Sequence, residues 1–121
     1  MQLRFGCCVL VAFAVLLPPA AHAACAEQIS KLMSKDTERL TTRYNRIAKQ
    51  IQKRGSTAKL VAEECRIARQ LTPRLQGQLA AIKQSGCMKD PEMGSMVADI
   101  VRGHEDDLAM VQKTTARSEC R

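Results

Sequence analysis

The spacing of four cysteines limits the folds available to this chain more than any other sequence feature. Cys25, Cys65, Cys87 and Cys120 follow an apolar N-terminal segment that contains the other two of the six cysteines. An even number of cysteines in an exported chain favours disulfide bonds over free thiols. A four-cysteine metal site is disfavoured, because no two of these positions form a C-x-x-C pair. The sequence therefore predicts two disulfide bonds.

The N-terminal segment has the pattern of a secretory signal peptide. A basic start precedes an unbroken apolar run at Cys7–Leu17, and a small-x-small sequence follows at Ala21–Ala23. This order is typical of a signal peptide, and the run is shorter than the ~20 residues that span a bilayer. An uncleaved anchor is one alternative. A lipoprotein signal, with Cys25 as the lipidated residue, is the other, and it is weakened by His22 three residues before that cysteine. We expect residues 1–23 to be removed, which leaves 24–121 as a single helical domain without a transmembrane span, periplasmic or secreted.

Three stretches after this segment have the apolar period of amphipathic helices. Gly55 and Gly86 separate them, and glycine readily takes the left-handed conformation that ends many helices. Ser56 or Thr57 is suited to cap the second helix, and Asp90 is suited to start the third. We expect helices at about 26–53, 58–85 and 91–117. Because short turns make neighbouring helices antiparallel, the sequence predicts an all-α, three-helix antiparallel up-down bundle.

Pro73 lies inside the second of these helices, where a proline removes one backbone hydrogen bond. It falls nearly opposite the apolar stripe of this helix, so the freed carbonyl of Arg69 would face water. We therefore expect a continuous helix that is kinked near Pro73. The alternative is a true break, with Thr72 as the cap and Pro73 as the first residue of a new helix.

The helical register predicts which cysteines pair. If the first two helices fold on each other about the turn at Arg54–Thr57, Cys25 faces about position 86, next to Cys87. Folding the third helix on the second places Cys65 opposite about position 113, so Cys120 reaches it only if the C-terminal residues fold back. We predict the bonds Cys25–Cys87 and Cys65–Cys120. Each is expected to stabilise the fold by roughly 2–4 kcal/mol.

The first helix carries most of its cations on one face. The whole chain has 19 Lys and Arg against 12 Asp and Glu, which gives a formal net charge of +7. On a helical wheel, seven cations of the first helix fall within an arc of roughly 120°, namely Lys31, Lys35, Arg39, Arg43, Arg46, Lys49 and Lys53. Such a stripe is suited to bind an anionic envelope polymer or an acidic protein. The alternative is a solvated helix face that keeps the protein soluble.

The third helix has the opposite charge bias. Glu92, Asp99 and Asp106 recur every seven residues, so they share one face of the helix. This acidic face is a candidate neighbour for the basic stripe, either within one molecule or between the two chains of a homodimer. Exposed ion pairs contribute only about 0–1 kcal/mol each, so such pairing would orient the helices more than stabilise them.

His104 is the only histidine after the signal segment, and it lies on the apolar side of the third helix. A partly buried histidine with a hydrogen-bond partner is the simpler interpretation. The alternative function is a periplasmic copper-binding protein, because thioether and imidazole ligands suit Cu(I) and Met93 and Met96 precede His104. A haem held between Met33 and His104 is a further alternative, which is disfavoured because the sequence has no C-x-x-C-H attachment motif. Since methionines at helical spacing usually fill a core, we assign no metal site and no cofactor.

Other classes of function are disfavoured. The sequence has no Gly-rich phosphate loop or zinc-helix motif, and one histidine on an apolar stripe is a poor basis for a nucleophile–histidine arrangement. Tyr44 is the only aromatic residue after the signal segment, which disfavours sequence-specific nucleic-acid binding because base stacking needs several aromatic side chains. The sequence predicts no enzyme, but a binding or interaction module that uses the basic stripe of its first helix.

Overall fold

The structure is a computed structural model that describes residues 24–121. Its long helices are α2 (Lys35–Arg54), α3 (Ala58–Gln84) and α4 (Gly94–Ala116), and its short 3₁₀ helices are η1 (Cys87–Lys89) and η2 (Ser118–Cys120). A further helical segment, 24–32, precedes α2. The expectation of an all-α fold is confirmed for this range. The predicted signal peptide, 1–23, lies outside the described residues.

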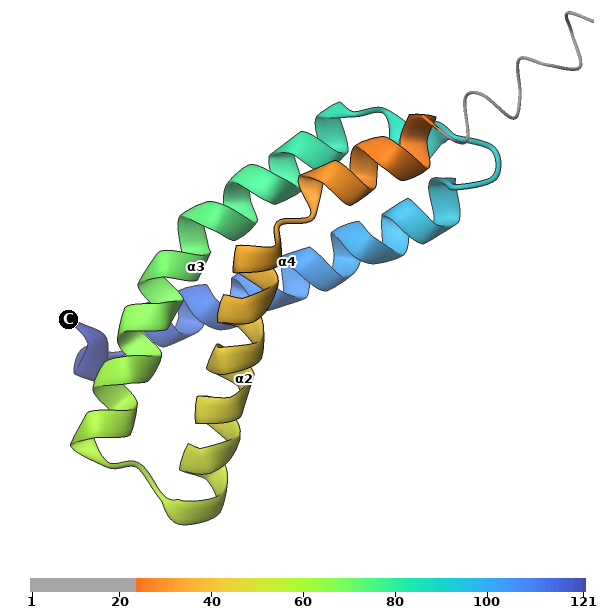
Figure 1. The fold of residues 1–121 in the computed structure, drawn as a ribbon. Coiled ribbons are helices and arrows are strands. Elements are labelled where there is room, and N and C mark those ends of the chain that lie inside the picture. The colour runs from red at the N-terminus through yellow and green to blue at the C-terminus, as the bar shows by residue number, and fades with distance from the viewer. Residues whose placement is uncertain (1–23) are drawn as a thin grey trace, which may run out of the picture.

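The helices build an elongated molecule (Figure 1). In this view α3 runs along its length, with α2 beside one half of α3 and the 24–32 segment near the other half (Figure 1). The main helix–helix interfaces are those of α3 with α4 and of α3 with α2. Within 24–121, no helix combines the length and the apolar character that crossing a membrane requires.

The prediction of a single helix at 26–53 is wrong, because the helix is interrupted at Met33 and Ser34. Ser34 has extended backbone angles, φ −74° and ψ 131°, and precedes the first turn of α2, which contains Asp36 and Glu38. Carboxylates are favoured in a first turn because the helix dipole is positive there. With four helices in the described chain, the simple order of three up-down helices is not confirmed.

Pro73 lies inside α3, which is continuous from Ala58 to Gln84. The helix therefore passes through the proline, and the predicted kink at this residue stays a prediction. The start of α3 follows the expected cap, since the Thr57 hydroxyl accepts a hydrogen bond from the backbone N–H of Leu60 at 3.2 Å.

The turn between α3 and α4 is longer than the sequence predicted, because α4 begins later. Gly86 follows α3 with φ 75°, a left-handed conformation that glycine adopts without strain. The Asp90 carboxylate accepts hydrogen bonds from the backbone N–H groups of Glu92 and Met93, each at 2.9 Å. Asp90 thus caps a turn, and α4 begins at Gly94 instead of the predicted position 91.

Both disulfides join the predicted pairs of cysteines. Cys25 bonds to Cys87 with a Cα–Cα distance of 5.7 Å, and Cys65 bonds to Cys120 with a Cα–Cα distance of 5.3 Å. The second pair forms because the chain leaves α4 after Ala116 and turns back through η2. Each bond therefore ties one end of the molecule to α3 or to the turn that follows it.

Two apolar clusters fill the interior, one near each disulfide. The first contains residues of α2, α3 and α4, with Tyr44, Ile47 and Leu71 among them. The second contains residues of the 24–32 segment, α3, η1 and α4, with Ile29 and Ile82 among them. Met33 lies at the helix break and is 41 % exposed.

Candidate functional site

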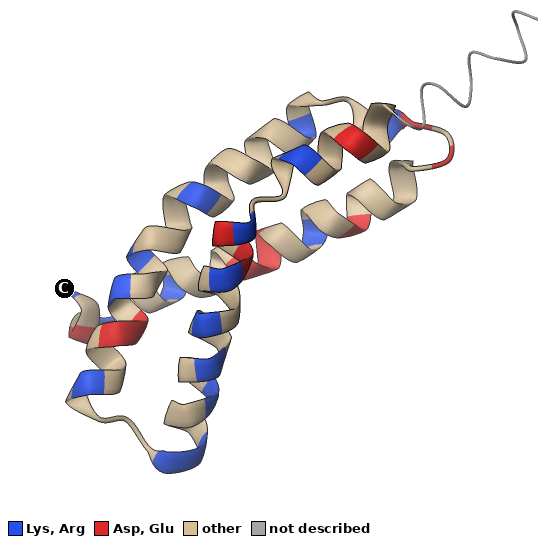
Figure 2. Cartoon of the chain, viewed as in Figure 1, with Lys and Arg blue, Asp and Glu red and all other residues tan. Residues whose placement is uncertain are grey.

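Among the three long helices of the described chain, α2 carries the largest net charge. The sequence of α2 has seven Lys and Arg against Asp36 and Glu38, which leaves a net charge of +5 on one helix. Figure 2 shows these cations along α2 down to the turn that precedes α3. We define the α2 basic face by its six exposed members from the predicted stripe, namely Lys35, Arg39, Arg43, Arg46, Lys49 and Lys53.

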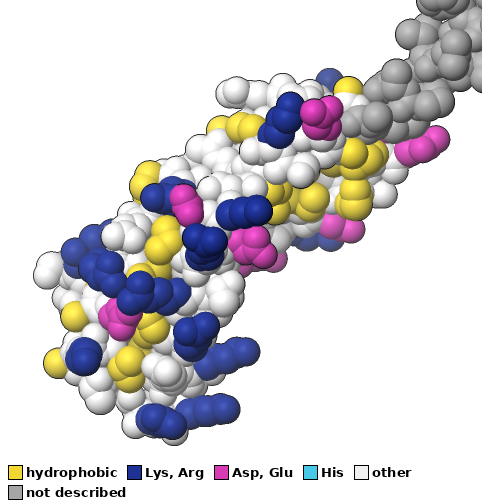
Figure 3. Space-filling view, viewed as in Figure 1, with side chains coloured by type: hydrophobic (Ala, Val, Ile, Leu, Met, Phe, Trp, Pro, Cys, Tyr) yellow, Lys and Arg dark blue, Asp and Glu magenta, His cyan; other side chains and the backbone are white. Residues whose placement is uncertain are grey.

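Four members of this face line a shallow groove of about 530 Å³. Lys35, Arg39, Arg43 and Arg46 contribute its cations, and Glu38 contributes its only carboxylate. The space-filling view shows cationic side chains gathered over this end of the molecule, with apolar atoms between them (Figure 3). A concave surface with this charge concentrates the electrostatic potential that attracts anions.

The cations of the α2 basic face differ in how they are paired. Arg43 donates to the Glu63 carboxylate of α3, and Arg39 lies 3.9 Å from the Asp36 carboxylate of its own helix. Arg46, Lys49 and Lys53 have no ion pair with any residue of the described range. Arg43 thus fixes the position of α2 on α3. Arg46, Lys49 and Lys53 offer their full charge to a partner.

Lys31 is not continuous with the other six cations of the predicted stripe. It lies on the 24–32 segment, before the break at Met33 and Ser34, and its ammonium is 3.0 Å from the Glu27 carboxylate. The wheel that grouped Lys31 with the others assumed one continuous helix. The structure therefore limits the candidate surface to α2.

The acidic face of α4 does not pair with α2 in the part of the molecule that the structure describes. Asp99, a member of this face, is 3.4 Å from Arg102 of its own helix, and the nearby Glu105, which lies outside the face, is 3.1 Å from Lys83 of α3. The ion pairs of the α2 cations go to α2 itself or to α3. Intramolecular neutralisation by α4, one of the two expected arrangements, is thus absent between these residues.

A second concave site, the break pocket, lies where the 24–32 segment meets α2. Its volume is about 230 Å³. The side chain of Gln78 on α3 makes three contacts there: its amide nitrogen is 2.7 Å from His104 Nε2 and 3.4 Å from Met33 Sδ, and its oxygen accepts from the Ser34 backbone N–H at 3.5 Å. Gln78 therefore holds the helix break against α3 and α4.

Asp107 also lines the break pocket, one turn beyond His104 on α4. Burial raises the pKa of the Asp107 carboxyl above its usual value, the nearby Asp106 carboxylate adds to the increase, and His104 opposes it. The pocket thus combines a thioether, an imidazole and a partly desolvated carboxyl group.

The structure does not bring together Met93, Met96 and His104, the residues of the alternative copper-binding interpretation. Met96 and Met93 precede His104 by eight and eleven residues, which corresponds to roughly 12 Å and 16 Å along a helix axis. Met93 packs against the second apolar cluster, and Met96 is 51 % exposed. Met33 of the distant helix break is the methionine that approaches His104, through Gln78.

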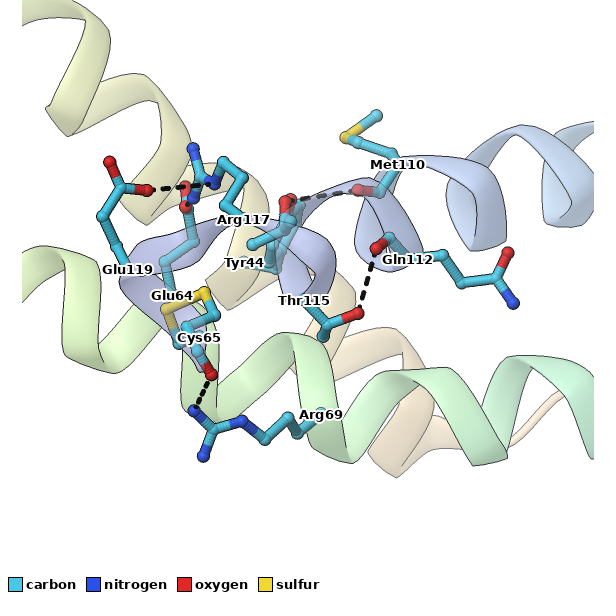
Figure 4. The surroundings of a disulfide bond; sticks show 11 residues. Tyr44, Glu64, Cys65, Arg69, Met110, Gln112, Thr115, Arg117 and Glu119 are labelled. Carbon is cyan, nitrogen blue, oxygen red and sulfur yellow. Dashed lines mark hydrogen bonds and ion pairs between the residues drawn. A yellow bond between two sulfur atoms is a disulfide. The ribbon is translucent and has the colours of Figure 1, made fainter.

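Polar contacts surround the Cys65–Cys120 bond (Figure 4). The buried Glu64 carboxylate accepts from the Arg117 guanidinium, and Arg69 donates to the Cys120 carbonyl at 2.7 Å. Tyr44 donates to Thr114 in the core, since the Thr114 hydroxyl itself donates to the Met110 carbonyl. These groups are committed to structure.

Sequence reasoning missed the helix break and the residue that holds it. Ser34 followed by Asp36 and Glu38 is a helix-start signal that could have located the break. No sequence signal marks Gln78, because its contacts with Ser34 and His104 depend on how three separate segments pack.

Comparison of the chain with protein-family models, curated proteins and solved structures gives no match in any of the three.

Proposed function

We propose that this protein is an exported, non-catalytic binding module whose α2 basic face holds an anionic polymer of the cell envelope. The observation that carries the proposal is the groove on α2, which is lined by four cations and one carboxylate. Two disulfides support folding in an oxidising compartment such as the periplasm or the extracellular space. The apolar N-terminal segment supports export.

The arrangement of the cations suits a flexible, phosphate-rich or carboxylate-rich chain. Successive members of the face are three or four residues apart, so a cation recurs about every 4.5–6 Å along the helix. Three of the six members are arginines, whose planar guanidinium groups bind phosphate and carboxylate through two parallel hydrogen bonds. Repeated contacts of this kind favour a polymer over a single small anion.

We also propose that α2, α3 and α4 form an antiparallel up-down arrangement with a bend in α3 near Pro73. The 24–32 segment extends this arrangement. The short connections between α2, α3 and α4 support this order, because short turns return the chain beside the preceding helix.

The test is binding of polyphosphate, polyglutamate and lipopolysaccharide to the oxidised mature protein across a salt series. We expect the affinity for an anionic polymer to fall steeply with salt concentration. The triple variant Arg39→Glu, Arg46→Glu, Lys49→Glu spares Arg43 and its contact with Glu63. It should lower affinity at low salt at least ~tenfold and reduce the salt slope by about one for each lost phosphate contact.

A matched control reverses three cations elsewhere: Arg74→Glu, Lys89→Glu and Lys113→Glu. These positions are exposed on α3, η1 and α4, and their reversal changes the net charge by the same amount. The control should bind with nearly the affinity of the unmodified protein. Equal losses in the two triple variants would show that only total charge matters, and the proposal would then be wrong.

The comparison with polyglutamate distinguishes the two classes of partner that a basic face can bind, an anionic envelope polymer and an acidic protein. Binding to polyphosphate and lipopolysaccharide that exceeds binding to polyglutamate supports an envelope polymer, whereas preference for polyglutamate favours an acidic protein. Concentration-dependent dimerisation that the α2 variant abolishes would instead assign the face to a second copy of this chain.

A further inference from the structure

The break pocket brings together two soft metal-binding atoms from distant parts of the chain. The thioether sulfur of Met33 and the Nε2 atom of His104 both lie within hydrogen-bond distance of one atom, the amide nitrogen of Gln78, at 3.4 Å and 2.7 Å. The sulfur and the imidazole nitrogen are therefore separated by less than the sum of these distances.

The hydrogen bonds of His104 define which ring nitrogen carries the proton. Nδ1 lies 2.9 Å from the Ile100 carbonyl oxygen, which can only accept, so Nδ1 is protonated. Nε2 then accepts from the Gln78 amide, and its lone pair points into the pocket. Metal-binding histidines are commonly oriented in this way, with one ring N–H on a backbone carbonyl and the other nitrogen free to bind a metal.

The amide nitrogen of Gln78 occupies the position that a cation would take. Its two N–H groups direct partial positive charge at the sulfur of Met33 and at the lone pair of His104. The Gln78 oxygen is held in place by the Ser34 N–H, which fixes the orientation of the amide. The two ligand atoms are thus already aligned on a shared electropositive group.

The pocket also has the freedom that exchange of this amide for a metal ion requires. Met33 is 41 % exposed in the helix break, and its side chain has three rotatable bonds and a polarisable sulfur. The cavity beside it is about 230 Å³. Release of the 3.5 Å contact between Ser34 and Gln78, together with rotation of the exposed Met33 side chain, would bring the two ligand atoms onto one ion.

We infer that Met33 and His104 form a binding site for Cu(I) at the break between the 24–32 segment and α2. A thioether with an imidazole selects soft Cu(I) over hard divalent cations. Within the described range, no three His, Cys, Asp or Glu side chains are grouped to hold a metal ion. The site uses none of the cations of the α2 basic face, while Glu38 and Thr42 line both the break pocket and the groove.

The test is an anaerobic titration of the oxidised protein with Cu(I), in competition with a chromogenic Cu(I) chelator. We expect one Cu(I) per chain with a Kd below about 1 μM. Met33→Leu conserves side-chain volume and so should preserve the fold, and His104→Gln keeps a polar group at the second position. Each substitution should weaken Cu(I) binding ~tenfold or more.

The matched control is Met96→Leu, which removes a similarly exposed methionine from α4 and should leave Cu(I) affinity unchanged. Methyl NMR of the methionines, with Ag(I) as a redox-inert analogue, gives a second readout in which the Met33 signal moves first. A Kd weaker than about 1 μM, unchanged affinity of Met33→Leu, or equal movement of the Met33, Met96 and Met110 signals would overturn the inference.

Discussion

The two halves of the molecule each contain one disulfide bond, but the polar contacts near the two bonds differ. Around Cys65–Cys120, a buried carboxylate meets Arg117, and Arg69 holds the Cys120 carbonyl. Towards Cys25–Cys87, the first helix is interrupted at Met33 and Ser34, and Gln78 links this break to α3 and α4 through hydrogen bonds. We call these the Cys65–Cys120 half and the Cys25–Cys87 half.

This difference separates two kinds of binding surface. The Cys65–Cys120 half holds α2 through Tyr44, Ile47 and the Arg43–Glu63 contact, so it presents the α2 basic face on a fixed helix. The Cys25–Cys87 half adjoins the break pocket, whose ligands Met33 and His104 lie outside α2, while Thr37 and Glu38 of α2 also line the pocket. A charged face gains from rigidity because less ordering is needed on binding, whereas binding of a metal ion by Met33 and His104 requires the Gln78 amide to move away from them.

The largest expected effect comes from removing one disulfide at a time. The two bonds close chain segments of similar length, with sequence separations of 62 and 55 residues, so chain entropy alone assigns about 4 kcal/mol to each. Cys65→Ala with Cys120→Ala also frees the carbonyl that Arg69 holds, which adds roughly 1 kcal/mol. Urea unfolding of both double variants measures the difference, and a larger loss for the Cys25–Cys87 pair would reverse our comparison.

Removal of Arg117 should have the next largest effect. Glu64 is only 4 % exposed, so Arg117→Ala leaves a buried carboxylate without its cation and should lower the free energy of unfolding by about 3 kcal/mol. Arg102→Ala is the matched control, because its pair with Asp99 is exposed and contributes about 0–1 kcal/mol. Equal losses in chemical unfolding would show that the Glu64–Arg117 contact does not fix this half.

The smallest expected effect is at Asp107 in the break pocket. Burial raises the pKa of this carboxyl in the folded state, so the folded protein binds the proton more tightly than the unfolded chain does. Stability should therefore fall as pH rises from the unfolded-state pKa through the raised folded-state pKa. Asp107→Asn should remove this dependence and be slightly more stable than the unmodified protein at pH 7.

Unfolding measured between about pH 3 and pH 7 tests the Asp107 prediction. The advantage of Asp107→Asn should shrink as the pH falls and the native carboxyl is protonated. Asp99→Asn, at an exposed position of the same helix, should show no such advantage. A stabilising effect of Asp107→Asn that persists at pH 3 would mean that burial of the charge is not its cause.

The sequence predicted the features that depend on regular helical register. The turn after Arg54 placed Cys25 beside Cys87, and the same reasoning required the C-terminal residues to fold back so that Cys120 reaches Cys65, as η2 does. The break at Ser34 was missed because neither glycine nor proline marks it. A serine and two following carboxylates give a weaker signal, which competes with the apolar period that continues across the break.

The features of the candidate sites differed in how predictable they were. Six cations of the α2 basic face were predictable because they depend only on helical spacing. Met33 and His104 were paired from the sequence only as an alternative pair of haem ligands. The Gln78 side chain that contacts both was not predicted, since it comes from a third helix. Contacts that need three separate segments carry no periodic signal in a single sequence.

Residue-resolved amide NMR during a polyphosphate titration tests the central claim, that α2 binds anions from the fixed half of the molecule. If α2 binds the polymer, the amide chemical shifts should change mainly along residues 35–54. The amides of residues 24–32 and 94–116 should be nearly unchanged, and added salt should reverse the changes. Shifts centred on α4, on the 24–32 segment, or spread evenly over all exposed cations would contradict it.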